Sequence, residues 1–274
     1  CAGDERSAQR YRNVQFAVKG EFARSHMGRF AVALLTCLLL GTPALAQQQA
    51  QARTYVIVHG AWGGGWAWHT IDSMLTSQGH RVFRPSLTGL GDRVHLASPN
   101  IGLDTHITDV VNLILWERLQ NVILIGHSYG GMVITGAADR LGDRIGQMIY
   151  VDAMVPDSGE SALDIMGPQF QSMVRTNARN GLVPPVWNKP DTPLPTDVPH
   201  PLKTFTDTLH LSRARFAHPV VTYILTEEPA HMPDAFAAFA QRAAARGWRV
   251  ERMQGDHVPY RSAPGVLIKL LRPR

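Results

Sequence analysis

The chain has 274 residues and a formal net charge of +5 at pH 7, a length sufficient for one large domain with a sizeable core. The first 46 positions hold six of the 27 Lys and Arg residues and three of the 22 Asp and Glu residues, so about +2 is left on the remainder. The remainder has no Lys/Arg run of the kind that binds nucleic acid, and both cysteines, Cys1 and Cys37, fall outside it. A disulfide framework and a cysteine nucleophile are therefore excluded there.

Residues 27–46 have the pattern of a secretory signal peptide. Met27 opens a short basic segment, an apolar run covers 30–40, and Ala44-Leu45-Ala46 is typical of a cleavage site. The apolar run is shorter than the roughly 20 residues of a membrane span. We therefore expect an exported protein, secreted or periplasmic, whose mature form at 47–274 has no membrane span. Residues 1–26 are interpreted as an upstream remnant outside the fold.

From residue 54 onward, short apolar runs alternate with helical patterns. Strands are predicted at 54–58, 81–83, 121–125, 147–151, 220–225 and 248–253, and helices over 66–78, 104–120, 129–141 and 233–246. Such alternation predicts the α/β class, with a mostly parallel central sheet and helices on both faces.

The interval 154–219 interrupts this alternation. Its prolines stand at Pro184, Pro185, Pro190, Pro193, Pro195, Pro199 and Pro201, a density that forbids a continuous helix or strand. We interpret the interval as a lid insertion over the carboxyl edge of the sheet, where open α/β sheets bind ligands.

The segment Gly126-His127-Ser128-Tyr129-Gly130 fits G-x-S-x-G between a predicted strand and a predicted helix. A serine on such a sharp turn has a strained backbone, and side chains at 126 and 130 would collide with the neighbouring strand and helix. The pattern therefore predicts that Ser128 is a nucleophile exposed at a strand tip, beside the positive end of a helix.

A serine nucleophile needs a base, which in this order of elements comes last along the chain. His257, in Gly255-Asp256-His257-Val258-Pro259-Tyr260, is the histidine that follows the last predicted strand. The other scattered histidines lack metal-ligand spacing and are interpreted as solvated or locally bonded: His69, His80, His95, His200, His210, His218 and His231.

An oxyanion needs two backbone donors, and Tyr129, directly after the nucleophile, is expected to supply one. The glycine-rich turn after the first strand, residues 59–66, offers Ala61 as the second donor. The phosphate motifs G-x-G-x-x-G and G-x-x-x-x-G-K-[ST] are missing from this turn. Trp62 in this turn and Trp187 in the insertion are candidate substrate-binding residues.

The motifs I-V-H-G-A-W, L-T-G-L-G-D-R-V-H-L, G-H-S-Y-G-G and G-D-H-V-P-Y resemble the α/β-hydrolase superfamily. The nearest resemblance is to the branch of plant methylesterases and hydroxynitrile lyases, with their bacterial carboxylesterase relatives. This resemblance covers 47–274 and implies an α/β-hydrolase fold with a Ser-His-acid triad.

The acid is where the sequence departs from that branch, which normally places an Asp after the penultimate strand. Here Pro229 occupies the matching position. Asp152 is favoured instead, because it lies 24 residues after Ser128, as the acid does in some haloalkane dehalogenases that it resembles. Glu228 is the alternative acid, with Asp234 and Asp256 as further candidates.

These residues predict a serine carboxylesterase that acts on small to medium hydrophobic esters without a metal or organic cofactor. A hydroxynitrile-lyase type of lyase is the alternative, although the lysine which that chemistry requires in the plant branch has no evident match in Lys189, Lys203 or Lys269. A non-catalytic ligand-binding protein is the third reading. The expected partner is a small-molecule ester, and the oligomeric state does not follow from the sequence.

Overall fold

The computed structural model describes residues 52–189, 191–212, 220–227 and 236–272. The predicted signal peptide, the upstream segment and the beginning of the helix predicted at 233–246 lie outside these ranges. Glu228 and Asp234, two of the candidate acids, also lie outside them.

A six-stranded parallel sheet, in the order β2-β1-β3-β4-β7-β8, forms the centre of the domain. Its strands are β1 (Thr54–Val58), β2 (Arg81–Phe83), β3 (Val122–Ser128), β4 (Ile145–Ala153), β7 (Val221–Glu227) and β8 (Arg249–Gln254). All six strand predictions are confirmed within a few residues. Because the strands are parallel, the ends of β3 and β4 reach the same edge of the sheet, where Ser128 and Asp152 stand.

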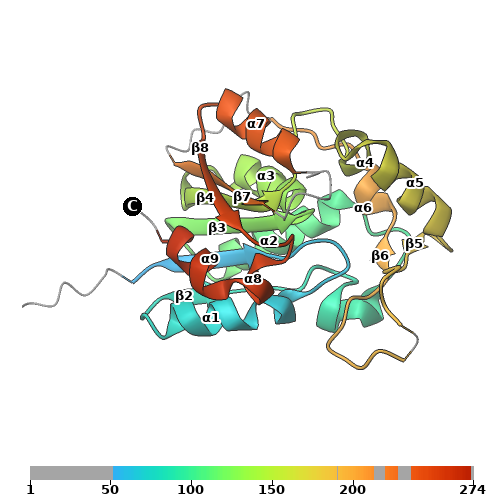
Figure 1. The fold of residues 1–274 in the computed structure, drawn as a ribbon, viewed down its shortest axis with the longest axis horizontal. Helices are drawn as coiled ribbons and strands as arrows, with labels where there is room; N and C mark the ends of the chain where they lie inside the picture. The colour runs from blue at the N-terminus through green and yellow to red at the C-terminus, as the bar shows by residue number, and fades with distance from the viewer. Residues whose placement is uncertain (1–51, 190, 213–219, 228–235, 273–274) are drawn as a thin grey trace, which may run out of the picture. The chain divides into compact units, whose positions relative to one another are not determined.

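Helices cover both faces of the sheet (Figure 1). One face packs against α2 (Leu103–Trp116), α3 (Gly130–Leu141) and α7 (Ala237–Ala245), and the other against α1 (His69–Thr76), α8 (Pro259–Ser262) and α9 (Pro264–Leu270). Alternate residues of β1 divide between the two cores: Val56 and Val58 face the first, Tyr55 and Ile57 the second. Short 3₁₀ turns lie at Gly65–Trp68, Gly91–Leu96 and Gly142–Arg144.

The insertion after β4 contains short elements of its own. They are α4 (Ala162–Ile165), α5 (Gly167–Asn177), β5 (Leu182–Val183), β6 (His200–Pro201) and α6 (Lys203–Thr206), with β5 and β6 paired antiparallel. Ser161 and Asp164 form a capping box at the start of α4. The described part of the proline-dense stretch between β5 and β6 has neither helix nor strand, as predicted.

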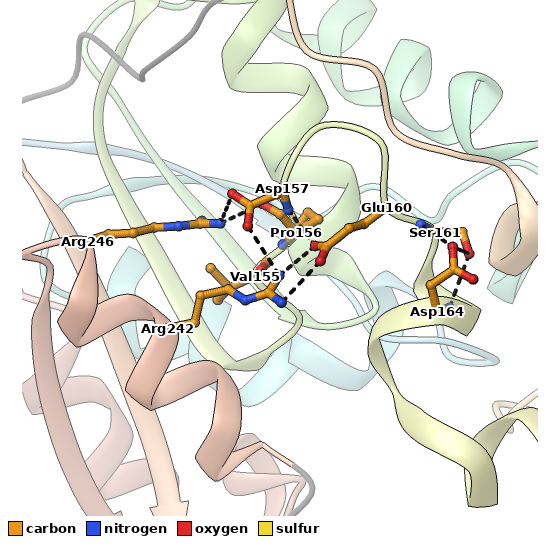
Figure 2. A network of polar contacts seen from close by, with 8 residues as sticks. All are labelled: Val155, Pro156, Asp157, Glu160, Ser161, Asp164, Arg242 and Arg246. Atoms are coloured by element: carbon orange, nitrogen blue, oxygen red, sulfur yellow. Dashed lines mark hydrogen bonds and ion pairs between the residues drawn. The ribbon is translucent and has the colours of Figure 1, made fainter.

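Two arginines, Arg242 in α7 and Arg246 directly after it, hold the beginning of the insertion (Figure 2). Arg242 donates to both carboxylate oxygens of Glu160, at 2.5 and 3.1 Å, and to the carbonyl oxygen of Val155 at 2.9 Å. Arg246 donates to Asp157 at 2.6 Å. These charge-assisted bonds fix the direction in which the chain leaves β4.

Candidate active site

Ser128 stands on a sharp turn between β3 and α3. Its φ of +53° lies in the left-handed region, which a side-chain-bearing residue rarely adopts. A Cβ on Gly126 would lie 2.8 Å from the carbonyl oxygen of Gly130, and one on Gly130 would lie 2.6 Å from that of Val58. Such contacts are too short for real Cβ atoms, which confirms why glycines flank the serine at these positions.

Ser128, His257 and Asp152 form a continuous hydrogen-bonded chain. The hydroxyl oxygen of Ser128 is 3.0 Å from Nε2 of His257, whose Nδ1 is 2.6 Å from Oδ2 of Asp152. Asp152 is only 2 % exposed, and its other oxygen accepts the backbone N–H of Thr226 at 3.2 Å. A carboxylate held in this way selects the tautomer with a proton on Nδ1, which makes Nε2 the acceptor for the serine proton.

An irregularity between β3 and β4 brings Asp152 to His257. The register shifts after His127, so that Ser128 pairs with Ala153, and Asp152 has a φ of +43°. Asp256 points elsewhere: it accepts the backbone N–H of Val258 at 2.9 Å and the hydroxyl of Ser262 at 2.7 Å. Of the four candidate acids, the structure brings Asp152 to the histidine, while Glu228 and Asp234 lie outside the described residues.

His127 holds the backbone of His257 and packs against its ring. Its Nε2–H donates to the carbonyl oxygen of His257 at 2.7 Å, and the two rings lie 4.7 Å apart. Burial, and secondarily the nearby His257, keeps the pKa of His127 well below its usual range, so the ring is neutral. Within the described part of the chain, Nδ1 of His127 is buried without a hydrogen-bond partner. Phe236 stacks on His257 at 4.5 Å between centroids.

The supporting role of His127 was not predicted, because the G-x-S-x-G pattern leaves this residue as a variable position. Alternation along β3 is the signal that could have found it. It directs this side chain to the face of Ile123 and Ile125, where it contacts Trp68 and Tyr260.

The loop that carries Ala61 is fixed by His59. Nδ1–H of His59 donates to the carbonyl oxygen of Gly60 at 2.8 Å, while Nε2 accepts the backbone N–H of Leu87 at 3.0 Å. Burial lowers the pKa of His59 to about 4, which keeps this neutral tautomer. The Gly60 carbonyl and the Ala61 N–H belong to one planar peptide group, so holding the carbonyl also sets the direction of that N–H.

Tyr129 directly precedes α3, and its side chain is fully buried and does not line the cavity. Its hydroxyl donates to Nδ1 of His106 at 3.0 Å, because Nε2–H of His106 donates to the carbonyl oxygen of Thr88. A role for Tyr129 in the site would therefore fall to its backbone N–H, as predicted for an oxyanion donor.

A cavity of about 510 Å³ opens at Ser128. It is lined by His59, Gly60, Ala61, Trp62, Gly63, Trp66, Ala67, His127, Ser128, Trp187, Asn188, Pro195, Thr196, Asp197, His257, Val258, Tyr260 and Arg261. The structure therefore places both candidate substrate-binding tryptophans, Trp62 and Trp187, on its wall. The Trp187 ring is half exposed and packs edge-on against Trp62 at 5.0 Å.

His200 is locally bonded, which is one of the two predicted alternatives, because its Nε2 lies 2.6 Å from the hydroxyl oxygen of Thr204. It is not solvated, and its other ring nitrogen makes a distant contact that was not predicted. The side chain is 0 % exposed, stacks on Phe205 at 4.3 Å, and accepts the backbone N–H of Trp62 at 3.1 Å. Its partner lies 138 residues away in the chain, so no sequence spacing could have indicated the contact.

Among the described residues, no group of three or more His, Cys, Asp or Glu side chains gathers in a way that could hold a metal ion. No helix in the described ranges has both the length and the apolar character needed to cross a bilayer.

A nucleophile turn on a parallel α/β sheet, with a histidine after the last strand, defines a hydrolase of the α/β type. A family model described as the alpha/beta hydrolase family matches residues 55–270, and the chain belongs to this family. The predicted superfamily and fold are confirmed.

Similar proteins include esterases from bacteria and plants. The "Carbendazim hydrolyzing esterase" of Nocardioides sp. is 50% identical over 112 residues, or 41% of this chain and 46% of that protein. "Methylesterase 2" of Arabidopsis thaliana is 30% identical over 125 residues, or 42% of this chain and 44% of that one. The matches thus span about half the length of these curated relatives.

A solved extracellular alpha/beta-hydrolase from a Paenibacillus species superposes with a TM-score of 0.67 at 23% identity. The match covers 80% of this chain and 97% of that one, and it supports the fold.

Proposed function

We propose that the protein is a serine carboxylesterase. The observation that carries the proposal is the unbroken chain from the Ser128 hydroxyl through His257 to the buried carboxylate of Asp152, at 3.0 and 2.6 Å. Ser128 and His257 both line the cavity, so the carbonyl carbon of a bound ester can reach the serine oxygen. The esterase names of its relatives support the same class.

The reaction follows from this geometry. Ser128 Oγ attacks the ester carbonyl while Nε2 of His257 takes its proton, and Asp152 stabilises the resulting imidazolium. The N–H groups of Ala61 and Tyr129 bind the oxyanion. His257 then protonates the leaving alcohol, and afterwards it activates the water that cleaves the acyl-enzyme and regenerates Ser128.

Small to medium hydrophobic esters are the proposed substrates. Trp62, Trp66, Trp187 and Tyr260 give the cavity aromatic walls, and its volume of about 510 Å³ suits a compact molecule. The signal-peptide pattern at 27–46 supports a secreted or periplasmic location for this activity.

The lyase alternative receives less support, because none of the three candidate lysines, Lys189, Lys203 and Lys269, lines the cavity. Lys203, the first residue of α6, pairs with Asp207 directly after this helix, at 2.5 Å. A purely ligand-binding role would leave the ordered Ser-His-Asp chain without a use.

Hydrolysis of p-nitrophenyl acetate, butyrate and octanoate by the wild type and by Ser128→Ala tests the proposal. We expect turnover by the wild type and a loss of at least about 10³-fold in the variant, since the nucleophile is gone. The preference among chain lengths then measures the usable depth of the cavity. Wild-type rates equal to those of Ser128→Ala would contradict ester hydrolysis.

A further inference from the structure

Trp62 follows the candidate oxyanion residue Ala61 and has a φ of +63°, an uncommon conformation for an aromatic residue. Three hydrogen bonds hold it, all from the insertion. Its backbone N–H donates to Nδ1 of His200 at 3.1 Å, its indole N–H donates to the carbonyl of Val183 at 2.8 Å, and its carbonyl accepts the N–H of Val198 at 2.9 Å.

The hydrogen bond that His200 accepts holds a peptide group of the loop that carries Ala61. The Trp62 N–H and the Ala61 carbonyl share one plane, just as the Ala61 N–H and the Gly60 carbonyl share the preceding one. His59 holds the preceding plane through the Gly60 carbonyl, and His200 holds the following plane through the Trp62 N–H. Two consecutive peptide groups, one on either side of the Ala61 Cα, are therefore fixed by two buried histidines.

The ring of His200 is itself fixed. Nε2–H donates to the hydroxyl of Thr204 at 2.6 Å, and that hydroxyl donates to the carbonyl of Pro201 at 2.8 Å. Because Nε2 carries the proton, Nδ1 is left as an acceptor for Trp62. Stacking against Phe205 fixes the plane of the ring.

We propose that His200 is a positioning residue for ester hydrolysis: it holds the Trp62 peptide group so that the Ala61 N–H points at the developing oxyanion. The insertion thus contributes to transition-state stabilisation as well as to the cavity wall. The inference rests on the proposed esterase function, and a donor displaced by a fraction of an ångström loses much of its effect on the transition state.

His200→Phe and His200→Asn test this role. Phe keeps an aromatic ring but removes the acceptor, whereas the Asn side-chain oxygen can take the place of Nδ1. We expect Phe to lower kcat about tenfold or more with KM within about threefold, and Asn to restore kcat to within about threefold of the wild type. His80→Phe is the matched control, because Nδ1 of His80 also accepts a backbone N–H, that of Arg53 at 3.3 Å, away from the cavity.

A second readout needs no substrate. Amide hydrogen exchange at Trp62, followed by NMR, is expected to be at least about tenfold faster in His200→Phe than in the wild type or in His200→Asn. If His200→Phe does not fold, His200→Gln replaces it, since Gln can reach Thr204 but has no polar atom at the Nδ1 position.

An unchanged kcat in the acceptor-free variant, an Asn variant as impaired as Phe, or unchanged exchange at Trp62 would each overturn the proposal. Inactivity of the wild type would overturn the esterase function instead, and the exchange rates would still show whether His200 holds the loop.

Discussion

Asp152 is the favoured acid of the proposed triad, with Glu228 as the alternative, and its role can be tested directly. Asp152→Asn is expected to lower kcat by about 10³ to 10⁴, because an amide can donate to Nδ1 and hold the wrong histidine tautomer. Glu228→Gln, the matched change at the alternative position, is expected to leave kcat within about twofold. Ester-hydrolysis kinetics of the two variants decide between the acids, and the reverse ranking would assign the role to Glu228.

Single residues were predictable where a local pattern specifies them. Ser128 follows from its glycine-flanked turn, and His257 from its place after the last strand. The bond from Asp152 to His257 depends on a register shift between β3 and β4, which no spacing encodes. The supporting contacts of His127 and His200 were missed because their partners are backbone groups more than 100 residues away.

At the level of elements, α3 packs so closely on the chain after β4 that Gly131 has no room for a side chain. A Cβ there would lie 2.0 Å from the carbonyl oxygen of Met154. Gly131→Ala is expected to lower the free energy of unfolding by about 3 kcal/mol or more, because α3 and the chain after β4 must separate. The measurement is urea unfolding followed by circular dichroism.

Gly265 in α9 provides the control, since a Cβ there meets nothing within 4 Å. Gly265→Ala is expected to change stability by less than about 1 kcal/mol, with a gain favoured by helix propensity. Equal losses in the two variants would show that crowding at α3 is not the cause.

Strands were predicted more reliably than helix ends or the insertion. Continuous apolar runs identify strands buried on both faces, as in β3. The helix predicted over 104–120 ends at Trp116, and Arg118 beyond it has a φ of +52°, which the apolar pattern does not reveal. Within the insertion, α4 and α6 are four residues long, too short for helical periodicity to appear.

At the scale of the whole molecule, the buried histidines predict that the free energy of unfolding falls at acidic pH. Burial lowers the pKa of His59 and of His106 to about 4. It also lowers the pKa values of His127 and His200 well below their usual range. The unfolded chain, whose histidines titrate near 6.5, takes up more protons below that pH than the folded chain does. Stability is therefore expected to be full above about pH 7 and to fall as the pH drops from about 6.5 to 4, by up to about 3 kcal/mol for each of the first two residues.

Urea midpoints at pH 7.5, 6 and 5 check this prediction. His106→Gln is expected to flatten the decline, because one of the proton-binding groups is then gone. A midpoint that stays constant from pH 7.5 to 5 would contradict the predicted linkage.

The insertion is held to the rest of the domain partly by the ion pairs of Arg242 and Arg246, whose side chains remain between one fifth and one third exposed. Segments with such partly solvated anchors open at lower free energy than a buried parallel sheet. Since the same insertion holds Trp62, its release would abolish the proposed esterase activity while the sheet is still intact. Heat or denaturant would therefore abolish turnover before the main circular dichroism transition, in which the sheet and its covering helices unfold, and cooling would restore turnover without refolding the sheet.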